Sequence, residues 1–515
     1  MTLAVDSLRI AYAGSAVVDG VSFSLPPSKC LGVVGESGSG KSQMGLALMG
    51  LLPATAETDG TVHIHGEALP DVARRDQLAM VFQDPQSAFC PHMRIADQVF
   101  EAMGGRDATA AAAFLKQAGL SNPEQVLAAY PHALSGGMRQ RAMLAMALAR
   151  TPSVIVADEP TTALDAEVQL ALLKEFAAVK ASGVSLILIS HDMGVIAGLA
   201  DDILVMQNGR AVEQGAAEAI LRQPQHPYTR DLIAAATLKQ AVPAQTQAGP
   251  VLIEGRGLTK RFPMPKAHPF ARTHVKQALV DAAIEVRAGE TLAIVGESGS
   301  GKSTLASLML GLAPPSEGEV LWKGQHFTAL PPQHQRRLRR HVQPVFQDPF
   351  ASFDPQRTLG RSIQDMIDLH GTNHSVEALL ASVNLSPDIA ERYPHQASGG
   401  QNQRAALARA LAADPEVLVC DEALSALDKT TQAQILALLQ RIKEERGLAM
   451  LFISHDLDVV AAIADRIAVL KDGHMVETGP VQQIMQSPQS PYTQRLLAAQ
   501  TVPDAAVMRA KITAS

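Results

Sequence analysis

An eight-residue segment, Gly-Glu-Ser-Gly-Ser-Gly-Lys-Ser, occurs twice in this chain, at residues 35–42 and 296–303. Each copy follows a short apolar run typical of a buried strand and precedes a run typical of a helix, which is the context that a phosphate-binding P-loop requires. Its glycines let successive backbone N–H groups curl around a phosphate, and the helix N-terminus adds the positive end of its dipole. The sequence therefore predicts two sites for nucleoside triphosphate.

The polar residues of each P-loop have separate expected roles. Lys41 and Lys302 are predicted to reach the β- and γ-phosphates, and Ser42 and Ser303 to ligate Mg²⁺. The residues predicted to bind nucleotide at the two copies are Gly35, Glu36, Ser37, Gly38, Ser39, Gly40, Lys41, Ser42 and Gln43, and Gly296, Glu297, Ser298, Gly299, Ser300, Gly301, Lys302, Ser303 and Thr304.

Composition limits the class of protein. The 515 residues, 47% hydrophobic and 18% charged, suit about two to four globular domains. The formal net charge of −7 gives no reason to expect binding to nucleic acid. No apolar run is long enough to cross a bilayer, and the N-terminus does not resemble a signal peptide. The three isolated cysteines, Cys30, Cys90 and Cys420, indicate a reducing compartment and argue against a cysteine-ligated metal centre.

The two halves of the chain repeat at a nearly constant offset of about 263 residues, which predicts two tandem domains. We expect a first domain at 1–235, a linker rich in Ala and Gln at 236–250, a second domain at 251–500 and a tail at 501–515. The matched residues include Lys41 with Lys302, Gln83 with Gln347, Ser135 with Ser398, Asp158 with Asp421, His191 with His455, and Tyr228 with Tyr492.

Polar residues end several of the apolar runs that are predicted to be strands. The carboxyl ends of parallel strands are where ligands bind in open α/β sheets. Because the same residue types recur at matched positions in both halves, we interpret them as part of the nucleotide sites. They are Gln83, Asp158, Glu159 and His191 in the first half and Gln347, Asp421, Glu422 and His455 in the second.

Two further features are more ambiguous. Ser135, Gly136 and Gly137, and likewise Ser398, Gly399 and Gly400, precede long helical runs. A serine N-cap followed by open N–H groups is a potential anion site, but alone it also fits an ordinary capped helix. Tyr12 and Phe262 lie upstream of the P-loops. They are candidates to stack on adenine, although packing on a sheet explains the pattern as well.

With these residues in place, each half resembles the ATP-binding protein of an ABC transporter. The P-loop, glutamine loop, Ser-Gly-Gly signature, Asp-Glu strand end, Ala-Leu-Asp loop and switch histidine occur in the family's order. The resemblance implies an α/β fold with two tandem P-loop NTPase domains. Each would have a RecA-like core, an antiparallel β subdomain and a helical subdomain, expected near 95–132 and 358–395. It also implies that the chain is an ATPase that uses ATP and Mg²⁺ and couples hydrolysis to transport across a membrane.

The family's architecture implies that each ATP is held between the P-loop of one half and the Ser-Gly-Gly segment of the other, with Asp165 and Asp428 coupling the two sites. Glu159 and Glu422 would polarise the attacking water. The implied catalytic residues are Glu159, Glu422, His191, His455, Gln83 and Gln347. The implied metal ligands are Ser42, Gln83, Asp158, Ser303, Gln347 and Asp421. The implied signature contacts are Ser135, Gly136, Gly137, Ser398, Gly399 and Gly400.

Departures from the family pattern are small. Gln43 stands where Thr304 supplies a second hydroxyl, and Met138 replaces the usual signature glutamine. Ala397 replaces the usual leucine, and Ala423 stands where the first half has a proline. Since none removes a charged or water-orienting group, both sites are expected to hydrolyse ATP. The first is expected to be the weaker if the two differ.

The subfamily can be narrowed by the segments after each glutamine and by the Pro-Tyr-Thr tails at 225–230 and 489–494. These resemble the peptide and nickel importer branch, and fused double versions are similar to glutathione and microcin-type peptide uptake ATPases. The resemblance implies two transmembrane permease subunits, an extracytoplasmic solute-binding protein and a peripheral place on the cytoplasmic face of the inner membrane. Cys90 stands where members of this branch usually have Asn or Asp before a proline, in the region where the permease would dock. Dipeptides, oligopeptides, glutathione-like peptides, opines and nickel all remain open as cargo.

An alternative from another class is a soluble twin-cassette ATPase that acts on ribosomes. Such proteins share the core motifs but usually have a longer and highly charged linker between the cassettes, whereas the expected linker here is short and nearly uncharged. A DNA-repair double cassette fits less well, because its zinc-binding cysteines are missing.

Overall fold

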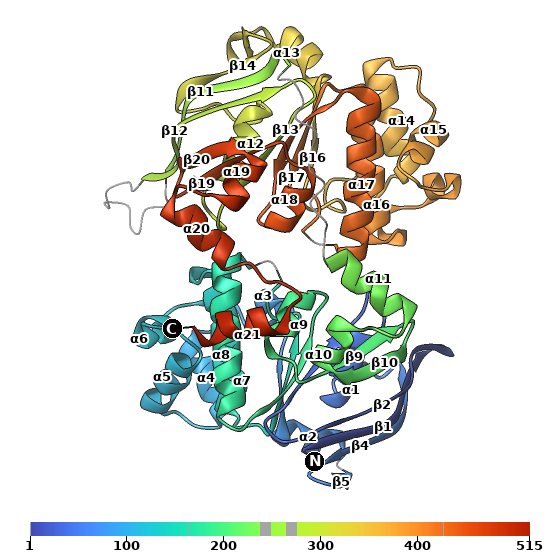
Figure 1. Cartoon of the computed structure of the whole chain (residues 1–515), viewed down its shortest axis with the longest axis vertical. Helices are drawn as coiled ribbons and strands as arrows, with labels where there is room; N and C mark the ends of the chain where they lie inside the picture. Colours follow the sequence, from blue (N-terminus) through green and yellow to red (C-terminus); the bar gives the residue numbers. More distant parts are fainter. Residues whose placement is uncertain are drawn as a thin grey trace. The chain divides into compact units, whose positions relative to one another are not determined.

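The structure is a computed structural model that describes residues 2–68, 70–162, 164–236, 249–263, 275–425 and 427–514. The chain forms two compact units (Figure 1). The first comprises Met1–Thr237, Asp428–Thr430 and Ala499–Ser515, and the second comprises Leu238–Leu427 and Thr431–Ala498. The predicted linker at 236–250 lies outside the described residues except at its two ends. None of the described helices has the length and apolar character that a membrane span requires.

The core of the first unit is a mixed sheet. Its strands, in spatial order, are β10 (Arg210–Ala216), β9 (Asp202–Gln207), β3 (Cys30–Val34), β8 (Ser185–Ile189), β7 (Val154–Asp158) and β6 (Leu78–Val81). Neighbours from β9 to β6 pair in parallel, and β10 is antiparallel to β9. Every residue of β3, β7 and β8 is buried. Their continuous apolar runs therefore match strands that are covered on both faces.

Alternate residues of β3 face different layers. Leu31 and Val33 pack on one side with helix α1 (Lys41–Leu48) and with a second, antiparallel sheet. That sheet contains β2 (Ser15–Leu25), β1 (Leu3–Tyr12), β4 (Ala56–Ile64) and β5 (Glu67–Ala68) in this order. Cys30 and Val34 face the helices on the other side. The period of two residues along the strand thus places the central sheet between two layers.

Side chains cap several helices of the first unit. Asp107, Asp165 and Asp192 each accept backbone N–H groups at the start of a helix, which is the usual way to satisfy the first turn. Besides α1 and a C-terminal helix described below, the α-helices of this unit are α2 (Asp71–Gln77), α3 (Pro85–Ala88), α4 (Ile95–Met103), α5 (Ala108–Gln117), α6 (Pro123–Ala128), α7 (Gly136–Ala149), α8 (Ala166–Ala181), α9 (Met193–Leu199), α10 (Ala217–Arg222) and α11 (Pro227–Ala236).

The second unit repeats this architecture. Its central sheet contains β16 (Val342–Val345), β17 (Val417–Asp421), β18 (Ala449–Ile453), β13 (Thr291–Val295), β19 (Arg466–Lys471) and β20 (His474–Pro480) in this order. The antiparallel sheet contains β12 (Val275–Arg287), β11 (Val251–Pro263), β14 (Glu317–Trp322) and β15 (Gln325–His326). The helices are α12 (Lys302–Met309), α13 (Pro332–Arg339), α14 (Leu359–His370), α15 (Val376–Ser382), α16 (Gly399–Leu411), α17 (Lys429–Arg446), α18 (Leu457–Ile463), α19 (Val481–Gln486) and α20 (Pro491–Ala498).

The C-terminal segment of the chain belongs to the first unit. Its helix α21 (Ala505–Thr513) packs against α9 and α8 (Figure 1). Two glycines one turn apart on α9 leave room for this segment. A Cβ atom at Gly194 would lie 2.7 Å from Cβ of Thr501, and one at Gly198 would lie 2.7 Å from Cδ1 of Ile512. The contact therefore requires glycine at Gly194, where backbone atoms lie close, whereas a side chain at Gly198 would displace only the end of the Ile512 side chain.

Candidate active sites

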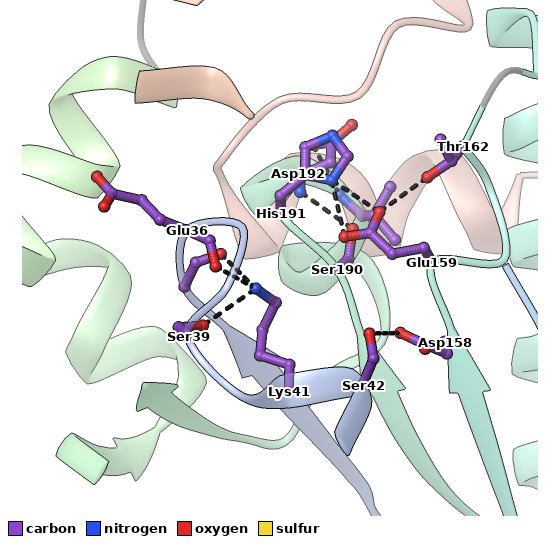
Figure 2. Close-up of polar contacts among 12 residues, drawn as sticks. Glu36, Ser39, Lys41, Ser42, Asp158, Glu159, Thr162, Ser190, His191 and Asp192 are labelled. Carbon is purple, nitrogen blue, oxygen red and sulfur yellow. Dashed lines mark hydrogen bonds and ion pairs between the residues drawn. The ribbon is translucent and has the colours of Figure 1, made fainter. Parts of the chain in front are cut away.

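The P-loop of the first unit encloses a buried lysine. The Nζ atom of Lys41 donates to the carbonyl oxygens of Gly35 and Glu36, at 2.8 and 2.7 Å, and to Oγ of Ser39 at 3.2 Å (Figure 2). Burial lowers the pKa of Lys41, against the opposing effect of Glu159. A buried ammonium group held by neutral oxygens is suited to an anionic ligand such as a phosphate.

The second P-loop has the same arrangement. The Nζ atom of Lys302 donates to the carbonyl oxygens of Gly296 and Glu297, at 2.8 and 2.9 Å. Lys302 is 4% exposed. In both units the strand, loop and helix that the sequence predicted are present, and the side chain of the first helical residue, the lysine, reaches back into the loop.

The helices that follow the P-loops begin without a side-chain cap. Gly40 precedes α1 with φ 96°, and Gly301 precedes α12 with φ 110°. A Cβ atom at Gly40 would lie 2.6 Å from the carbonyl oxygen of Val17, so glycine is required there for space as well as for conformation. Because no side chain caps the first turn by a hydrogen bond, its N–H groups remain available to a phosphate.

A serine and an aspartate meet beside each P-loop. The Oγ atom of Ser42 donates to Oδ1 of Asp158, and Ser303 donates to Oδ1 of Asp421, at 3.2 Å in both units. Burial raises the pKa of both aspartates above the ordinary value. A cation between these oxygens would offset the cost of burying the carboxylates.

The donor set of this pair fits Mg²⁺. Within the described residues, no group of three or more His, Cys, Asp and Glu side chains is arranged to hold a metal ion. Mg²⁺ is usually held by one or two protein oxygens, with waters and nucleotide phosphates completing its coordination. Ser42 with Asp158, and Ser303 with Asp421, supply oxygens of that kind.

The glutamates at the ends of β7 and β17 have an unusual backbone conformation. Glu159 has φ 49° and Glu422 has φ 47°, in the left-handed region that side chains other than glycine rarely adopt. The backbone N–H of Glu159 donates to the carbonyl oxygen of Ile189 at 2.9 Å, and that of Glu422 donates to Ile453 at 3.0 Å. Strain of this kind concentrates at functional sites, and here it recurs at the matched glutamate of each unit.

The Glu159 carboxylate has two side-chain partners (Figure 2). Oγ1 of Thr162 donates to Oε2 at 2.8 Å, and Nδ1 of His191 lies 2.7 Å from the same oxygen. Burial alone would raise the pKa of Glu159, but the hydrogen bond and charge of His191 hold that pKa below its usual value. Burial alone would lower the pKa of His191, but Glu159 raises it above the ordinary value. The two groups therefore stabilise each other as an ion pair.

The corresponding group in the second unit is more open. Nδ1 of His455 lies 3.7 Å from Oε2 of Glu422, and the Nε2 atom of Gln347 donates to that oxygen at 3.0 Å. His455 holds the pKa of Glu422 below its usual value, because its effect on that pKa is larger than the opposing effect of burial. Lys302 contributes an ion pair at 3.9 Å. Gln83, the counterpart of Gln347, is exposed at the end of β6, and its role as a metal ligand stays a prediction.

The Ser-Gly-Gly segments form exposed helix N-termini. Ser135 caps α7 by accepting the N–H of Met138 at 3.3 Å. Ser398 caps α16 by accepting the N–H of Gln401 at 3.3 Å, and the Gln401 side chain accepts the N–H of Ser398 in return. Because methionine cannot make the reciprocal bond, only the second segment forms a capping box. The predicted contact of these segments with nucleotide stays a prediction.

The two upstream aromatic residues have different surroundings. The hydroxyl of Tyr12 donates to Oε1 of Gln43 at 2.6 Å, so Tyr12 lies beside the helix that follows the P-loop. Phe262 is 42% exposed, and Nζ of Lys260 lies 5.4 Å from its ring centroid. The predicted stacking of both rings on adenine stays a prediction.

Comparison with protein families identifies both halves. The profile of the ABC transporter family matches residues 18–162 and again 279–425. The chain belongs to the ABC transporter family. A second profile, the C-terminal region of oligopeptide/dipeptide transporters, matches 212–250 and 476–513. The family resemblance and the tandem P-loop ATPase fold that the sequence implied are confirmed.

Similar proteins match over nearly the whole chain. The glutathione import ATP-binding protein GsiA of Escherichia coli (strain K12) is 40% identical, and the alignment covers 96% of this chain and 89% of that protein. GsiA of Salmonella choleraesuis (strain SC-B67) is 39% identical, and the alignment covers 98% of this chain and 90% of that protein. Among solved structures, the ATP-binding cassette MJ0796 bound to ADP and Pi is 30% identical and covers 45% of this chain and 99% of its own, with a TM-score of 0.40. This chain is therefore an ABC ATPase that binds and hydrolyses ATP.

Two residues that contact the P-loops have no role predicted by the sequence beyond their matched places in the Pro-Tyr-Thr tails. They are Tyr228 and Tyr492. In the structure the backbone N–H of Glu36 donates to the hydroxyl of Tyr228 at 2.8 Å, and that of Glu297 donates to Tyr492 at 3.1 Å. The matched spacing of the two tyrosines in the repeated halves is the available sequence signal. It does not show that each tail returns to the P-loop of its own cassette.

Proposed function

We propose that this chain is the energy-coupling ATPase of an importer for glutathione-like peptides. The observation that carries this proposal is the match of 96% of the chain to glutathione import ATP-binding proteins. The match of both tails to the C-terminal region of oligopeptide/dipeptide transporters supports a peptide-like cargo. It also favours the importer over the ribosome-acting alternative.

The hydrolytic step is assigned to the two strand-end glutamates. Glu159 and Glu422 polarise the attacking water, because their lowered pKa values keep them ionised and able to accept its proton. Lys41 and Lys302 hold the phosphates, and the two histidines stabilise charge on the γ-phosphoryl group. When bound, Mg²⁺ supplies positive charge that favours phosphoryl transfer, and Ser42, Asp158, Ser303 and Asp421 would hold it.

We further infer that each ATP is shared between the two cassettes. The exposed N-termini of α7 and α16 leave Ser135 and Ser398 free of the protein core, as a contact made from the opposite cassette requires. Asp165 caps α8 through the N–H of Val168, and with Asp428 it would couple the two sites. Fusion keeps both cassettes at a high effective concentration, which makes their closure on ATP an intramolecular event.

A methionine-rich groove on the first cassette is suited to a permease helix. It has a volume of about 470 Å³ and lies next to the glutamine loop, with Met80, Phe82, Cys90, Met93 and Met143 among the residues that line it. Flexible methionine side chains adapt to an inserted amphipathic helix. Docking of two permease subunits would hold the chain at the cytoplasmic face of the inner membrane. A solute-binding protein would deliver cargo to the permease from the opposite side of that membrane.

Cys90 makes this docking measurable. It is exposed, whereas Cys30 and Cys420 are buried, and burial raises the pKa of both buried thiols to about 12. A maleimide should therefore label Cys90 selectively. We expect the permease subunits, reconstituted with the full chain, to slow this labelling at least about tenfold, and Cys90→Ser to abolish it. Unchanged labelling in the complex would contradict docking at this groove.

The cargo is tested by transport in cells. Cells that lack this chain should lose ATP-dependent uptake of labelled glutathione, and expression of the wild-type chain should restore it. Excess unlabelled dipeptide and Ni²⁺ serve as competitors that separate the possible cargoes. Normal uptake without the chain, together with co-purification of the chain with ribosomes, would favour the ribosome-acting alternative.

A further inference from the structure

The tail of each cassette places a buried tyrosine against the P-loop of the same cassette. Tyr228 is the second residue of α11 and Tyr492 the second residue of α20. They are 9% and 4% exposed. Each hydroxyl accepts the backbone N–H of the glutamate that follows the first P-loop glycine. The same contact is present in two cassettes whose tails differ in sequence.

The tyrosine and the P-loop lysine bind opposite ends of one peptide group. In the peptide between Gly35 and Glu36, the carbonyl oxygen accepts from Nζ of Lys41 at 2.8 Å, and the N–H donates to Tyr228. The peptide between Gly296 and Glu297 is held in the same way by Lys302 and Tyr492. Because the C=O and N–H of a trans peptide point in opposite directions, these two contacts fix its orientation.

The tail itself is anchored to the edge strand of the central sheet. Glu213, on β10, accepts the backbone N–H groups of Gln225 and His226, at 2.8 and 3.1 Å. In the second cassette Glu477, on β20, accepts those of Gln489 and Ser490, at 2.7 and 3.1 Å. A chain of hydrogen bonds therefore runs from the sheet edge through the tail to the P-loop. It holds the hydroxyl in place before any ligand binds.

We propose that Tyr228 and Tyr492 are positioning residues that preorganise the P-loops for the triphosphate. Each keeps the carbonyl of its peptide turned toward the lysine, and so keeps the ammonium group within the loop. If the hydroxyl were absent, the peptide could rotate and direct its carbonyl away from the lysine. The binding of ATP would then have to reorder the loop, and this would lower the affinity of the site for ATP. This inference rests on the proposed role of the P-loop lysines in holding phosphate.

The test is the full-length double variant Tyr228→Phe with Tyr492→Phe, which removes two hydroxyl groups and leaves both rings in place. We expect the KM for ATP to rise about three- to tenfold, the factor that corresponds to one hydrogen bond at each site. The kcat should stay within about twofold, because the tyrosines touch no reacting atom. Tyr130→Phe is the matched control, since Tyr130 is 38% exposed and precedes the Ser-Gly-Gly segment.

A second variant separates positioning from a loss of folding. Glu213→Gln keeps the tyrosine but weakens the anchor of its tail, and it should raise the KM by a smaller factor with the same thermal unfolding midpoint. An unchanged KM in the double Phe variant, or a fall in kcat alone, would overturn the inference. Wild-type protein without ATPase activity in the same assay would instead count against the proposed function.

Discussion

Nδ1 of His191 lies 2.7 Å from the Glu159 carboxylate, whereas the matched pair in the second cassette, His455 and Glu422, is separated by 3.7 Å. In the first cassette the imidazole of His191 and the hydroxyl of Thr162 both contact the Glu159 carboxylate. In the second the carboxylate is also held by Gln347. The two sites carry the same residue types but differ in which neighbours restrain the glutamate side chain.

Removing both glutamate charges should separate binding from hydrolysis. In Glu159→Gln with Glu422→Gln, the amides cannot accept a proton from water, and turnover is expected to fall at least ~100-fold. ATP affinity should be retained, because the P-loop lysines are unchanged. ATPase assays and equilibrium binding of labelled ATP measure the two effects. Near-normal turnover in the double variant would show that another group polarises the water.

The ion pair of His191 and Glu159 predicts the direction in which folding stability changes with pH. Burial alone lowers the pKa of His191, and Glu159 raises it above its ordinary value of 6.5. The stability from this histidine is complete below its unfolded-state pKa and is lost as the pH rises through the raised folded-state value. Glu159 has a lowered pKa, so its contribution is complete above its unfolded-state value. That contribution is lost as the pH falls through the lowered value.

An NMR titration of the full chain measures this coupling directly. The imidazole of His191, assigned by its absence in His191→Gln, should titrate above pH 6.5. In Glu159→Gln the midpoint should fall, because burial then opposes protonation without the compensating carboxylate. The same midpoint in wild type and Glu159→Gln would show that the pair is not coupled. His65, an exposed histidine just after β4, provides a reference resonance that neither substitution should move.

Much of the site follows from local sequence. A P-loop is one contiguous segment between a strand and a helix, so Lys41 and Ser42 could be placed in it without knowing the fold. The acids at the ends of β7 and β17 could be placed because parallel strands end at one edge of a sheet. The positive φ of Glu159 and Glu422 left no signal, since glutamate has no preference for that conformation.

Contacts between distant segments were not predictable in this way. The hydroxyl of Tyr228 reaches Glu36 across 192 positions of the chain, and no local pattern specifies such a pairing. The sequence predicts only a tail at 501–515. The structure forms α21 there and packs it on the first cassette. That contact depends on Gly194 in α9, which from sequence alone looks like a weak point of a helix.

The hydroxyl and carboxylate beside each P-loop predict a specific metal dependence. In Ser42→Ala with Ser303→Ala, one oxygen is lost from each proposed Mg²⁺ site, and the Mg²⁺ concentration for half-maximal ATPase activity should rise about 10- to 100-fold. Excess EDTA should stop hydrolysis by the wild-type protein. Ser307→Ala is a control in the same helix, since its Oγ donates only to the carbonyl oxygen of Ser303. Equal Mg²⁺ dependence in all three proteins would exclude the two serines as ligands.

The glycine groove of α9 predicts a position-specific effect on the C-terminal segment. The second cassette has Asp458 where the first has Gly194, so the helix itself accepts aspartate at this position. In the first cassette a Cβ atom there would lie 2.8 Å from the backbone nitrogen of Val502. Gly194→Asp should therefore release the segment at a cost of about 1–3 kcal/mol.

Limited proteolysis measures that release. Arg509 and Lys511 lie in α21, and trypsin cleavage there should become about 5- to 150-fold faster in Gly194→Asp, in proportion to the open population. Asp458→Gly is the reciprocal control and should leave the cleavage rate unchanged. A chain that ends at residue 498 completes a double-mutant cycle, because Gly194→Asp should cost little stability once its partner is absent. An equal loss of stability in the full-length and shortened chains would mean that the substitution disrupts α9 itself rather than its contact with Thr501.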